Sequence, residues 1–445
     1  MKNTPITMPH SLYWFTNDLR LSDNALIALA AKQSSAISFI YCVDPKWFKS
    51  NHFNCQTLGE QRWAFLAKSL HALNNQLNQF GQHLVIYFQA PLEVINHYYT
   101  HHNTRMLYCS EQIGLNERQA LTAISNQYTD LVIRQSNTFT LYDIQQLPFE
   151  LTELPSTFTQ FRKKIESSNL SLKAPIDAPS HFPAPLIAPV PWPKSLPNVQ
   201  KVSTVFGAGE IAAQRHIEQY FSSAAPSEYK LTRNALDGMT NSTKFSPWLA
   251  NGNLSVRQIM AALQQYEQKH GANGSSYWIY FELLWREYFQ LYSLKFGSKL
   301  FTFSGIGSNK PLTSFYPSRF KQWCAGTTAY PIVNACMKQL NQTGYMSNRG
   351  RQLAASCLVN ELNLDWRFGA AYFEQQLIDY DVAANWGNWQ YLAGVGADPR
   401  SGRQFNLPKQ TQMYDPDNRF IHHWHGNEVS PLDANNAADW PLSKL

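Results

Sequence analysis

Residues 11–43 read SLYWFTNDLRLSDNALIALAAKQSSAISFIYCV and contain the pattern that decides the fold of the first part of the chain. Two apolar runs, at 12–16 and 36–43, are separated by an amphipathic stretch at 24–32. Similar apolar runs follow at 83–88, 105–109 and 131–135, with further helical patterns at 58–80, 91–101 and 116–126. Strands that alternate with helices over short connections predict a Rossmann-like, doubly wound parallel sheet with right-handed crossovers.

The loop after the first predicted strand, residues 17–23 (NDLRLSD), lies where α/β folds usually bind ligands. No GxGxxG follows that strand, so the fingerprint of a nicotinamide dinucleotide site is missing. Ser22 or Asp23 is the expected N-cap of the next helix, and this structural role is the simpler interpretation of either residue alone.

The chain changes character after the predicted sheet. Residues 148–197 hold ten of the 24 prolines, so most of this segment should be extended or irregular. From residue 205 onward helical periodicity dominates, without strand alternation or an internal repeat. The clearest helical patterns cover residues 209–222, 256–270, 278–296, 330–342, 348–363 and 367–380. We therefore expect an α/β domain at 8–140, a connector at 141–204, an all-helical domain at 205–430 and a short tail at 431–445.

Length and composition indicate a globular protein of two or three domains. Its 445 residues suffice for a substantial core, and 14% aromatic with 15% charged residues argues against a disordered chain. The formal charge of +6 permits nucleic-acid binding without demonstrating it. The six cysteines show no CxxC pair, and the sequence shows neither a secretory signal nor a membrane span. We expect a soluble, cytoplasmic protein with reduced thiols.

Residues 379–391 (DYDVAANWGNWQY) are the most informative stretch for function. They combine acidic and amide side chains with two tryptophans and two tyrosines, whereas an ordinary core helix would contain far more leucine and isoleucine. The combination indicates a site where carboxylates and amides meet a flat aromatic heterocycle. It points to a flavin-like ligand rather than to a metal or a phosphoryl substrate.

Residues 242–247 (STKFSP) are typical of a phosphate-binding turn. Hydroxyl groups, backbone amides and the cation of Lys244 precede a helix that Pro247 could start, and helix N-termini bind phosphate. Arg233 is a second cation nearby. The simpler alternative is a serine N-cap followed by proline at the first helical position.

Glu282, Trp285, Arg286 and Phe289 share one face of a predicted helix, because they are spaced i, i+3, i+4 and i+7. A carboxylate beside an indole could hold a flat, hydrogen-bonding ligand such as a base against the ring. The alternative is an intrahelical Glu282–Arg286 ion pair over a core tryptophan.

Residues 344–352 (GYMSNRGRQ) open another helix with polar and basic side chains. Arginine suits phosphate or carboxylate, and asparagine and glutamine suit base edges. Cations at a helix N-terminus oppose its dipole, so they suggest a fixed anionic partner, with solvated arginines as the alternative. Residues 422–425 (HHWH) resemble a metal cluster only superficially, because adjacent histidines do not converge easily on one ion. We expect no metal.

Taken in order, these motifs resemble the photolyase/cryptochrome family, and most closely its DASH-type cryptochrome branch. The resemblance covers nearly the whole chain, through residues 14–24, 242–249, 282–287, 328–333, 344–352, 379–391, 394–400 and 414–416. Two positions mark the branch, since typical dimer photolyases have Met where Gln352 lies and Trp where Tyr391 lies. A (6-4) photolyase would need histidines at Asn348 and Gln352, and both are absent.

The resemblance implies a U-shaped FAD in the helical domain. Its contacts would be Tyr229, Ser242, Thr243, Lys244, Phe245, Ser246, Arg351, Asp379, Asp381 and Asn385. Asn385 would face flavin N5, where an amide does not protonate the one-electron-reduced ring as an acid would. The reduced flavin then remains a strong donor in its excited state.

The resemblance further implies light-driven repair of cyclobutane pyrimidine dimers, preferentially in single-stranded DNA. Glu282, Trp285 and Asn385 would be the catalytic residues. The flipped-out dimer would contact Glu282, Trp285, Asn348, Arg349, Gln352 and Tyr391. The polar Gln352 and Tyr391 would bind the dimer less tightly than an apolar wall, and so would offset less of the energy needed to flip it out of a duplex. The resemblance therefore implies a preference for single strands. The protein is expected to act as a monomer.

The family's photoreduction chain and antenna site match this chain less well. Trp389 and Trp366 correspond to the inner two relay tryptophans, with core packing as the alternative for each. Thr313 stands where the outer tryptophan is expected, and Tyr316 is the substitute to consider. Glu111 is the candidate contact for an antenna chromophore, 5,10-methenyltetrahydrofolate, although alignment places Gly114 at that position.

Two other classes of function stay open. A blue-light photoreceptor would bind FAD and DNA but would signal rather than repair. A helical nucleic-acid-binding protein without a cofactor would be colourless when pure.

Overall fold

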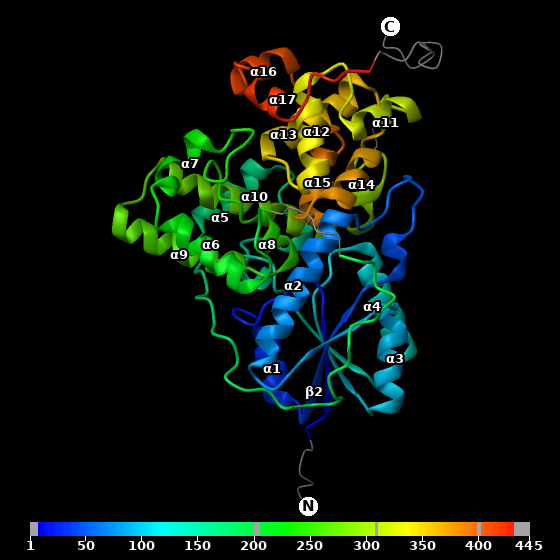
Figure 1. The fold of residues 1–445 in the computed structure, drawn as a ribbon. Coiled ribbons are helices and arrows are strands. Elements are labelled where there is room, and N and C mark those ends of the chain that lie inside the picture. The colour runs from blue at the N-terminus through cyan, green and yellow to red at the C-terminus, as the bar shows by residue number, and fades with distance from the viewer. Residues whose placement is uncertain (1–7, 169, 200–204, 308–309, 398–401, 431–445) are drawn as a thin grey trace, which may run out of the picture.

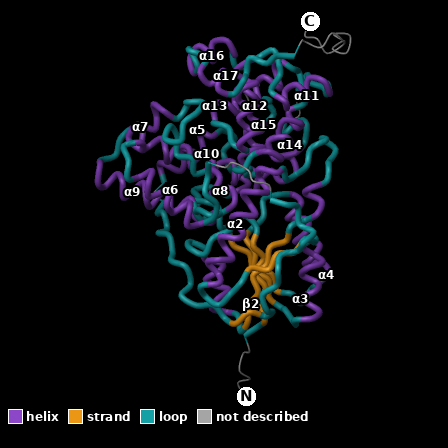
Figure 2. Tube along the Cα trace, viewed as in Figure 1, coloured by secondary structure: helices purple, strands orange, loops and turns teal. Residues whose placement is uncertain are grey.

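The computed structural model describes residues 8–168, 170–199, 205–307, 310–397 and 402–430. Five strands form a parallel sheet in the order β3-β2-β1-β4-β5. Their bounds are β1 His10–Phe15, β2 Ala36–Cys42, β3 Leu84–Tyr87, β4 Met106–Ser110 and β5 Val132–Ser136. Figures 1 and 2 show the sheet toward the N-terminal end of the molecule, with the helical part at its other end. The predicted doubly wound sheet is confirmed.

Helices cover both faces of the sheet (Figure 1). They are α1 (Ala25–Gln33) and α2 (Glu60–Asn78) on one face, and α3 (Pro91–His101) and α4 (Leu115–Gln127) on the other. Tyr13 and Phe15 of β1 pack toward the first pair of helices, and Leu12 and Trp14 toward the second. Because side chains alternate across a strand, β1 is buried on both faces and is almost continuously apolar.

The proline-rich segment contains one helix that its sequence did not predict, α5 (Phe158–Ser167). Thr157 caps this helix by accepting from the backbone N–H of Gln160. Phe158, Phe161 and Ile165 form its buried face and pack into the helical core. The following residues run back along the sheet, where β6 (Ala184–Pro185) pairs in parallel with the first residues of β2. A proline is tolerated there because this short strand lies at an edge.

The rest of the described chain is helical (Figure 2). The α-helices are α6 (Glu210–Phe221), α7 (Ala225–Thr232), α8 (Ser246–Asn251), α9 (Val256–His270), α10 (Gly274–Phe296), α11 (Pro317–Ala325), α12 (Pro331–Thr343), α13 (Asn348–Ser356), α14 (Trp366–Gln376), α15 (Val382–Leu392), α16 (Leu407–Tyr414) and α17 (Arg419–His423). Short 3-10 turns lie at η1 (Pro45–Phe48), η2 (Ile144–Gln146), η3 (Leu151–Glu153) and η4 (Gly297–Phe301), and η5 (Cys357–Glu361) is a π-helix. No described helix could cross a membrane.

The predicted helix at residues 367–380 is too long at its C-terminal end, since α14 stops at Gln376. Leu377 is extended, and the backbone N–H of Ile378 donates to the carbonyl of Gly344 rather than to a helical carbonyl. Asp381 then caps α15 by accepting from the backbone N–H of Ala384. This break places Asp379 in a turn between two helices.

The loop after β1 joins the sheet to the helical part. The buried guanidinium of Arg20 donates to the carbonyls of Asp23, Thr138 and Gly252 at 2.8–3.0 Å. Asn24, not Ser22 or Asp23, caps α1, because Asp23 has a positive φ of 51° and its carboxylate accepts from Arg257 instead. Residues 18–23 therefore have a structural role between the two parts.

Candidate functional site

A cavity of about 520 Å³ lies within the helical part, between α7, α8, α10, α13 and α15. It brings together fourteen of the residues that the sequence singled out: Tyr229, Thr243, Phe245, Ser246, Glu282, Trp285, Asn348, Arg351, Gln352, Asp379, Asp381, Asn385, Trp389 and Tyr391. Cavities of this size hold ligands as large as a nucleotide cofactor. We call it the helical cavity.

Asp379 and Arg351 form a charged pair on one side of the helical cavity. One guanidinium nitrogen of Arg351 donates to both carboxylate oxygens of Asp379, at 2.7 and 2.9 Å. The Nε of Arg351 donates to the carbonyl of Met346 at 2.9 Å, which holds the guanidinium in place. The Asp379 side chain is only 1% exposed, so Arg351 is the partner that compensates for its burial.

Asp381 and Asn385, one turn apart on α15, present an acid and an amide to the same cavity. The carboxylate of Asp381 accepts from Gln290 at 2.6 Å and lies 3.5 Å from Arg286. The amide nitrogen of Asn385 donates to the carbonyl of Ala370 at 3.0 Å, which fixes the orientation of its side chain. Both polar groups are therefore held by the protein before any ligand binds.

Glu282 pairs with Arg233 rather than with Arg286. The alternative of an intrahelical Glu282–Arg286 pair is therefore wrong, because Arg286 instead approaches Asp381 and donates to the carbonyl of Phe139 at 2.6 Å. Burial raises the pKa of the Glu282 carboxyl, and the charge of Arg233 opposes that rise. Arg233 also lies over the ring of Trp278, 4.6 Å from its centroid.

Trp285 has one face covered by another aromatic ring. Phe158 of α5 stacks on it with ring centroids 3.8 Å apart and an interplanar angle of 12°. Tyr391 meets it edge-on, at 5.9 Å and 68°, and the guanidinium of Arg403 lies 4.5 Å from the centroid of Tyr391. Sequence reasoning missed Phe158 and Arg403, since neither belongs to a motif, and treated Arg233 only as a nearby cation.

Four predicted site residues do not line the helical cavity: Ser242, Lys244, Arg349 and Trp366. Lys244 is buried with a positive φ of 54°, and its ammonium lies 4.8 Å from the centroid of Tyr345. Burial lowers the pKa of Lys244 to about 8. Arg349 is turned away from Asn348 and Gln352 by the helical twist and donates to Asn234 at 3.0 Å. The indole nitrogen of Trp366 donates to the carbonyl of Phe303.

A second cavity of about 490 Å³ lies between the C-terminal edge of the sheet and the helical part. We call it the sheet-edge cavity. Glu111, the candidate antenna contact, lines it together with Glu117 and Glu374, which the sequence did not single out. A Cβ atom at Gly114 would lie 2.0 Å from a carboxylate oxygen of Glu117. Glu117 therefore occupies the space that a side chain at position 114 would fill.

Carboxyl groups in the sheet-edge cavity are poorly solvated. Burial raises the pKa of Glu117, Glu111 and Glu374, the last to about 7. Arg62 is the cation that opposes the rise at Glu117 and Glu374. A neutral carboxyl can both donate and accept a hydrogen bond, so this cavity can bind the polar edge of a heterocycle.

Two family descriptions match this chain. Residues 278–440 match the FAD binding domain of DNA photolyase, and residues 11–184 match DNA photolyase. The chain is 51% identical over 434 residues to the Cryptochrome DASH of Idiomarina loihiensis, with 97% of this chain and 96% of that protein covered. The chain belongs to the photolyase/cryptochrome family. Within the family it is similar to DASH-type cryptochromes, and the predicted FAD-binding helical domain is confirmed.

Solved structures of photolyase/cryptochrome proteins agree with this assignment. The cryptochrome of Synechocystis sp. PCC6803 matches with a TM-score of 0.89 and 38% identity, covering 95% of this chain and 89% of that chain. A bacterial class III photolyase from Agrobacterium tumefaciens matches with a TM-score of 0.78 and 26% identity, covering 95% and 88%. The parallel sheet and the helical FAD-binding domain are thus features of the family.

Proposed function

We propose that this protein repairs cyclobutane pyrimidine dimers in DNA, preferentially in single strands, with light as the energy source and FAD as the cofactor. The observation that carries the proposal is that Glu282, Trp285 and Tyr391 share one cavity with Asp379 and Asn385. Groups suited to a base and groups suited to a flavin thus line the same space. When bound and reduced, FAD would supply one excited electron to the dimer and take it back after the ring opens.

The side chains of the helical cavity fit FAD. Asp379 and Asp381 can accept from N–H and hydroxyl groups, and Arg351 fixes the position of the Asp379 carboxylate through two hydrogen bonds. Asn385 offers an amide that is already oriented by Ala370. Thr243 and Ser246 offer hydroxyl groups beside Tyr229. The α8 helix has only six residues, so its dipole would add little to phosphate binding.

The dimer would be held by Glu282 and Trp285. Phe158 stacks on Trp285, and Phe289 lies 5.6 Å from it at 27°; we propose that a pyrimidine ring stacks on the part of the Trp285 ring that lines the helical cavity. Glu282 is held in place by Arg233 and can accept from the N–H edge of that ring. Asn348 and Gln352 lie one turn apart on α13, and we propose that they contact the lesion strand, with Arg349 on its backbone.

A preference for single strands is consistent with the polar residues Gln352 and Tyr391 in the helical cavity. A base must leave its stack before it enters such a cavity, and a single strand loses less stacking and pairing energy than a duplex does. The stacking of Arg403 on Tyr391 adds a cation where a DNA phosphate could approach. We propose that the protein acts as a monomer on such strands.

The sheet-edge cavity is proposed to hold an antenna chromophore, 5,10-methenyltetrahydrofolate. The carboxyl groups of Glu111, Glu117 and Glu374, whose pKa values burial raises, could bind the amide-like edge of a pterin ring. Trp386 and Asp381 line this cavity, and Asp381 lines the helical cavity as well, so the two cavities are neighbours. That proximity would suit transfer of excitation energy to FAD.

One experiment tests the repair proposal. Purified, FAD-containing protein is reduced with dithionite and illuminated with dimer-containing oligonucleotides, single-stranded or duplex, and restored pyrimidines are counted. We expect faster repair of the single strand. A FAD-containing, reduced protein that repairs neither substrate contradicts the proposal. That result would favour a blue-light photoreceptor instead, a function compatible with the cryptochrome name of the relatives.

A further inference from the structure

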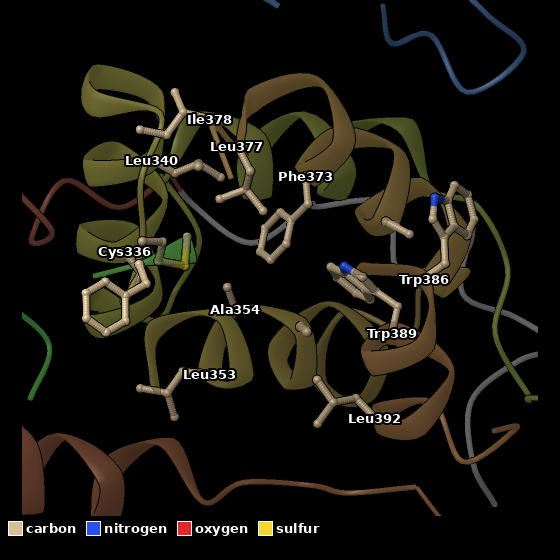
Figure 3. Packing of buried hydrophobic residues seen from close by; sticks show 14 of the residues in the cluster. Cys336, Leu340, Leu353, Ala354, Phe373, Leu377, Ile378, Trp386, Trp389 and Leu392 are labelled. Atoms are coloured by element: carbon tan, nitrogen blue, oxygen red, sulfur yellow. The ribbon is translucent and has the colours of Figure 1, made fainter. Parts of the chain in front are cut away.

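Trp389 is the most deeply buried of the tryptophans that line the helical cavity. It is 2% exposed, and its ring contacts among the described residues are with Phe373, at 5.1 Å, and Trp323, at 6.2 Å and 71°. Figure 3 shows the ring of Trp389 turned toward Phe373, while Trp386 of the same helix points elsewhere. The next indole from the cavity is therefore Trp323, on α11.

Trp323 leads on to a half-buried tyrosine. Its fully buried ring meets Tyr372 edge-on, with centroids 5.7 Å apart at 67°, and its indole nitrogen donates to the carbonyl of Ala354. The hydroxyl of Tyr372 donates to the side-chain oxygen of Asn341 at 2.7 Å and accepts from Gln376 at 3.1 Å. The hydroxyl also lies 3.3 Å from the carbonyl of Cys324, and both Tyr372 and Asn341 are partly exposed.

Trp366, the inner relay residue implied by the family resemblance, lies on a different branch. Its described tryptophan neighbour is Trp386, 5.8 Å away, which lines the sheet-edge cavity. Thr313 stands where the resemblance expects the outer relay tryptophan, and a threonine side chain cannot be oxidised as an aromatic ring can. Tyr316 lies under the guanidinium of Arg319 and makes no ring contact with a described tryptophan.

We propose that Tyr372, Trp323 and Trp389 form the route by which electrons reach FAD from the surface in this chain. The inference rests on the proposed function only in requiring FAD in the helical cavity. With FAD bound, oxidised and photoexcited, Trp389 would give up one electron, which Trp323 and then Tyr372 would replace. Tyr372 would lose its hydroxyl proton to solvent and become a neutral radical. An external thiol then returns a hydrogen atom to it and is itself oxidised to a thiyl radical.

The test uses the FAD-containing protein with the flavin oxidised and a thiol in excess. Photoreduction under blue light is followed by the loss of oxidised flavin absorbance in the wild type and in Trp323→Phe, Tyr372→Phe and Trp366→Phe. We expect Trp323→Phe to lose photoreduction. Tyr372→Phe should no longer accumulate reduced flavin in response to added thiol. Trp366→Phe should retain both photoreduction and the response to thiol. Transient EPR of the wild type should show a tyrosyl radical, whose spectrum narrows when ring-deuterated tyrosine is incorporated.

Trp323 is fully buried, so the FAD content and melting temperature of the Trp323→Phe variant are measured as well. Tyr372→Phe removes only a hydroxyl at a partly exposed position and remains informative if Trp323→Phe folds poorly. Wild-type photoreduction in a folded Trp323→Phe, or in Tyr372→Phe at every thiol concentration, overturns the route. Dithionite-reduced protein does not need the route, so a failure of repair in that assay counts against the proposed function alone.

Discussion

The guanidinium of Arg233 donates to the carboxylate of Glu282 inside the helical cavity, with the two side chains 17% and 28% exposed. Arg233 follows α7 and Glu282 lies on α10, so the pair also ties two cavity walls together. The carboxylate is thereby held as a charged acceptor at a position where burial alone would favour its neutral form.

Glu282→Gln should slow repair while leaving FAD content unchanged. The substitution keeps the shape but removes the charged acceptor, and a hydrogen bond to a charged group contributes about 1.5–3 kcal/mol, or roughly 10- to 100-fold in kcat/KM. The measurement is light-driven repair of a single-stranded substrate. Glu228→Gln, an exposed position on α7, is the control. Full repair by Glu282→Gln would contradict the proposed role.

Asp379→Asn should reduce both FAD retention and stability. Arg351 would keep its charge in a largely buried position without its partner, and such a loss destabilises by about 3 kcal/mol or more. Flavin absorbance per protein and the free energy of unfolding report the two effects. The matched control is Asp417→Asn, because Asp417 pairs with Arg419 at 3.4 Å on the surface, with side chains 66% and 86% exposed. Equal effects at both positions would rule out the proposed FAD contact.

Asn385→Asp should stabilise the one-electron-reduced form of the flavin. A carboxyl at position 385 would face the carbonyl of Ala370, and this contact favours a protonated acid. Such an acid could give its proton to flavin N5, so the one-electron-reduced, protonated flavin should accumulate under anaerobic illumination. Absorption spectroscopy detects it at long wavelength. The same change at Asn360, whose amide donates to the carbonyl of Ser356 and which does not line the helical cavity, should leave the spectra unchanged.

Glu117→Gln should weaken binding of 5,10-methenyltetrahydrofolate more than Glu111→Gln does. The carboxyl group of Glu117 fills the space above Gly114, whereas Glu111 lies at the start of the loop between β4 and α4. Loss of one hydrogen bond to a poorly solvated group should weaken binding about tenfold. Titration of purified protein with the chromophore, followed by its absorbance and fluorescence, measures the affinity. The reverse order of effects would restore Glu111 as the contact.

Glu374 should make the protein less stable as the pH rises. Burial raises the pKa of its carboxyl from 4.5 to about 7, against the opposing charge of Arg62 and the hydrogen bond from Tyr380, while Glu117 adds to the rise. The pKa of Glu374 is higher in the folded than in the unfolded protein. Its protonated carboxyl therefore stabilises the fold fully below pH 4.5, and this stabilisation is lost as the pH approaches 7. The loss should be at most about 3 kcal/mol.

Unfolding at pH 5 to 8 compares wild type with Glu374→Gln, which should show a flatter pH dependence. Glu93→Gln, at an exposed position on α3, should retain the wild-type slope. If the free energy of unfolding had the same pH dependence in the wild type and in Glu374→Gln, the raised pKa of Glu374 would be contradicted.

Sequence patterns predicted most of the fold because they record local preferences. The apolar runs located all five main strands, and the helical patterns located the cores of α9, α10 and α12. They missed α5, since ten prolines dominate the composition around it, and they extended α14 past Gln376. That helix ends because Ile378 bonds to Gly344, a contact between residues far apart in the chain.

The sequence by itself determined which chemistry is present: acids, amides and indoles in the family order, with Gln352 and Tyr391 marking the branch. Tertiary structure alone decided which of these groups meet. Glu282 pairs with Arg233 rather than Arg286, Glu117 covers Gly114, and Trp389 faces Trp323. The physical reason is that spacing along a helix places side chains on a face, whereas the partner of that face depends on how separate elements pack.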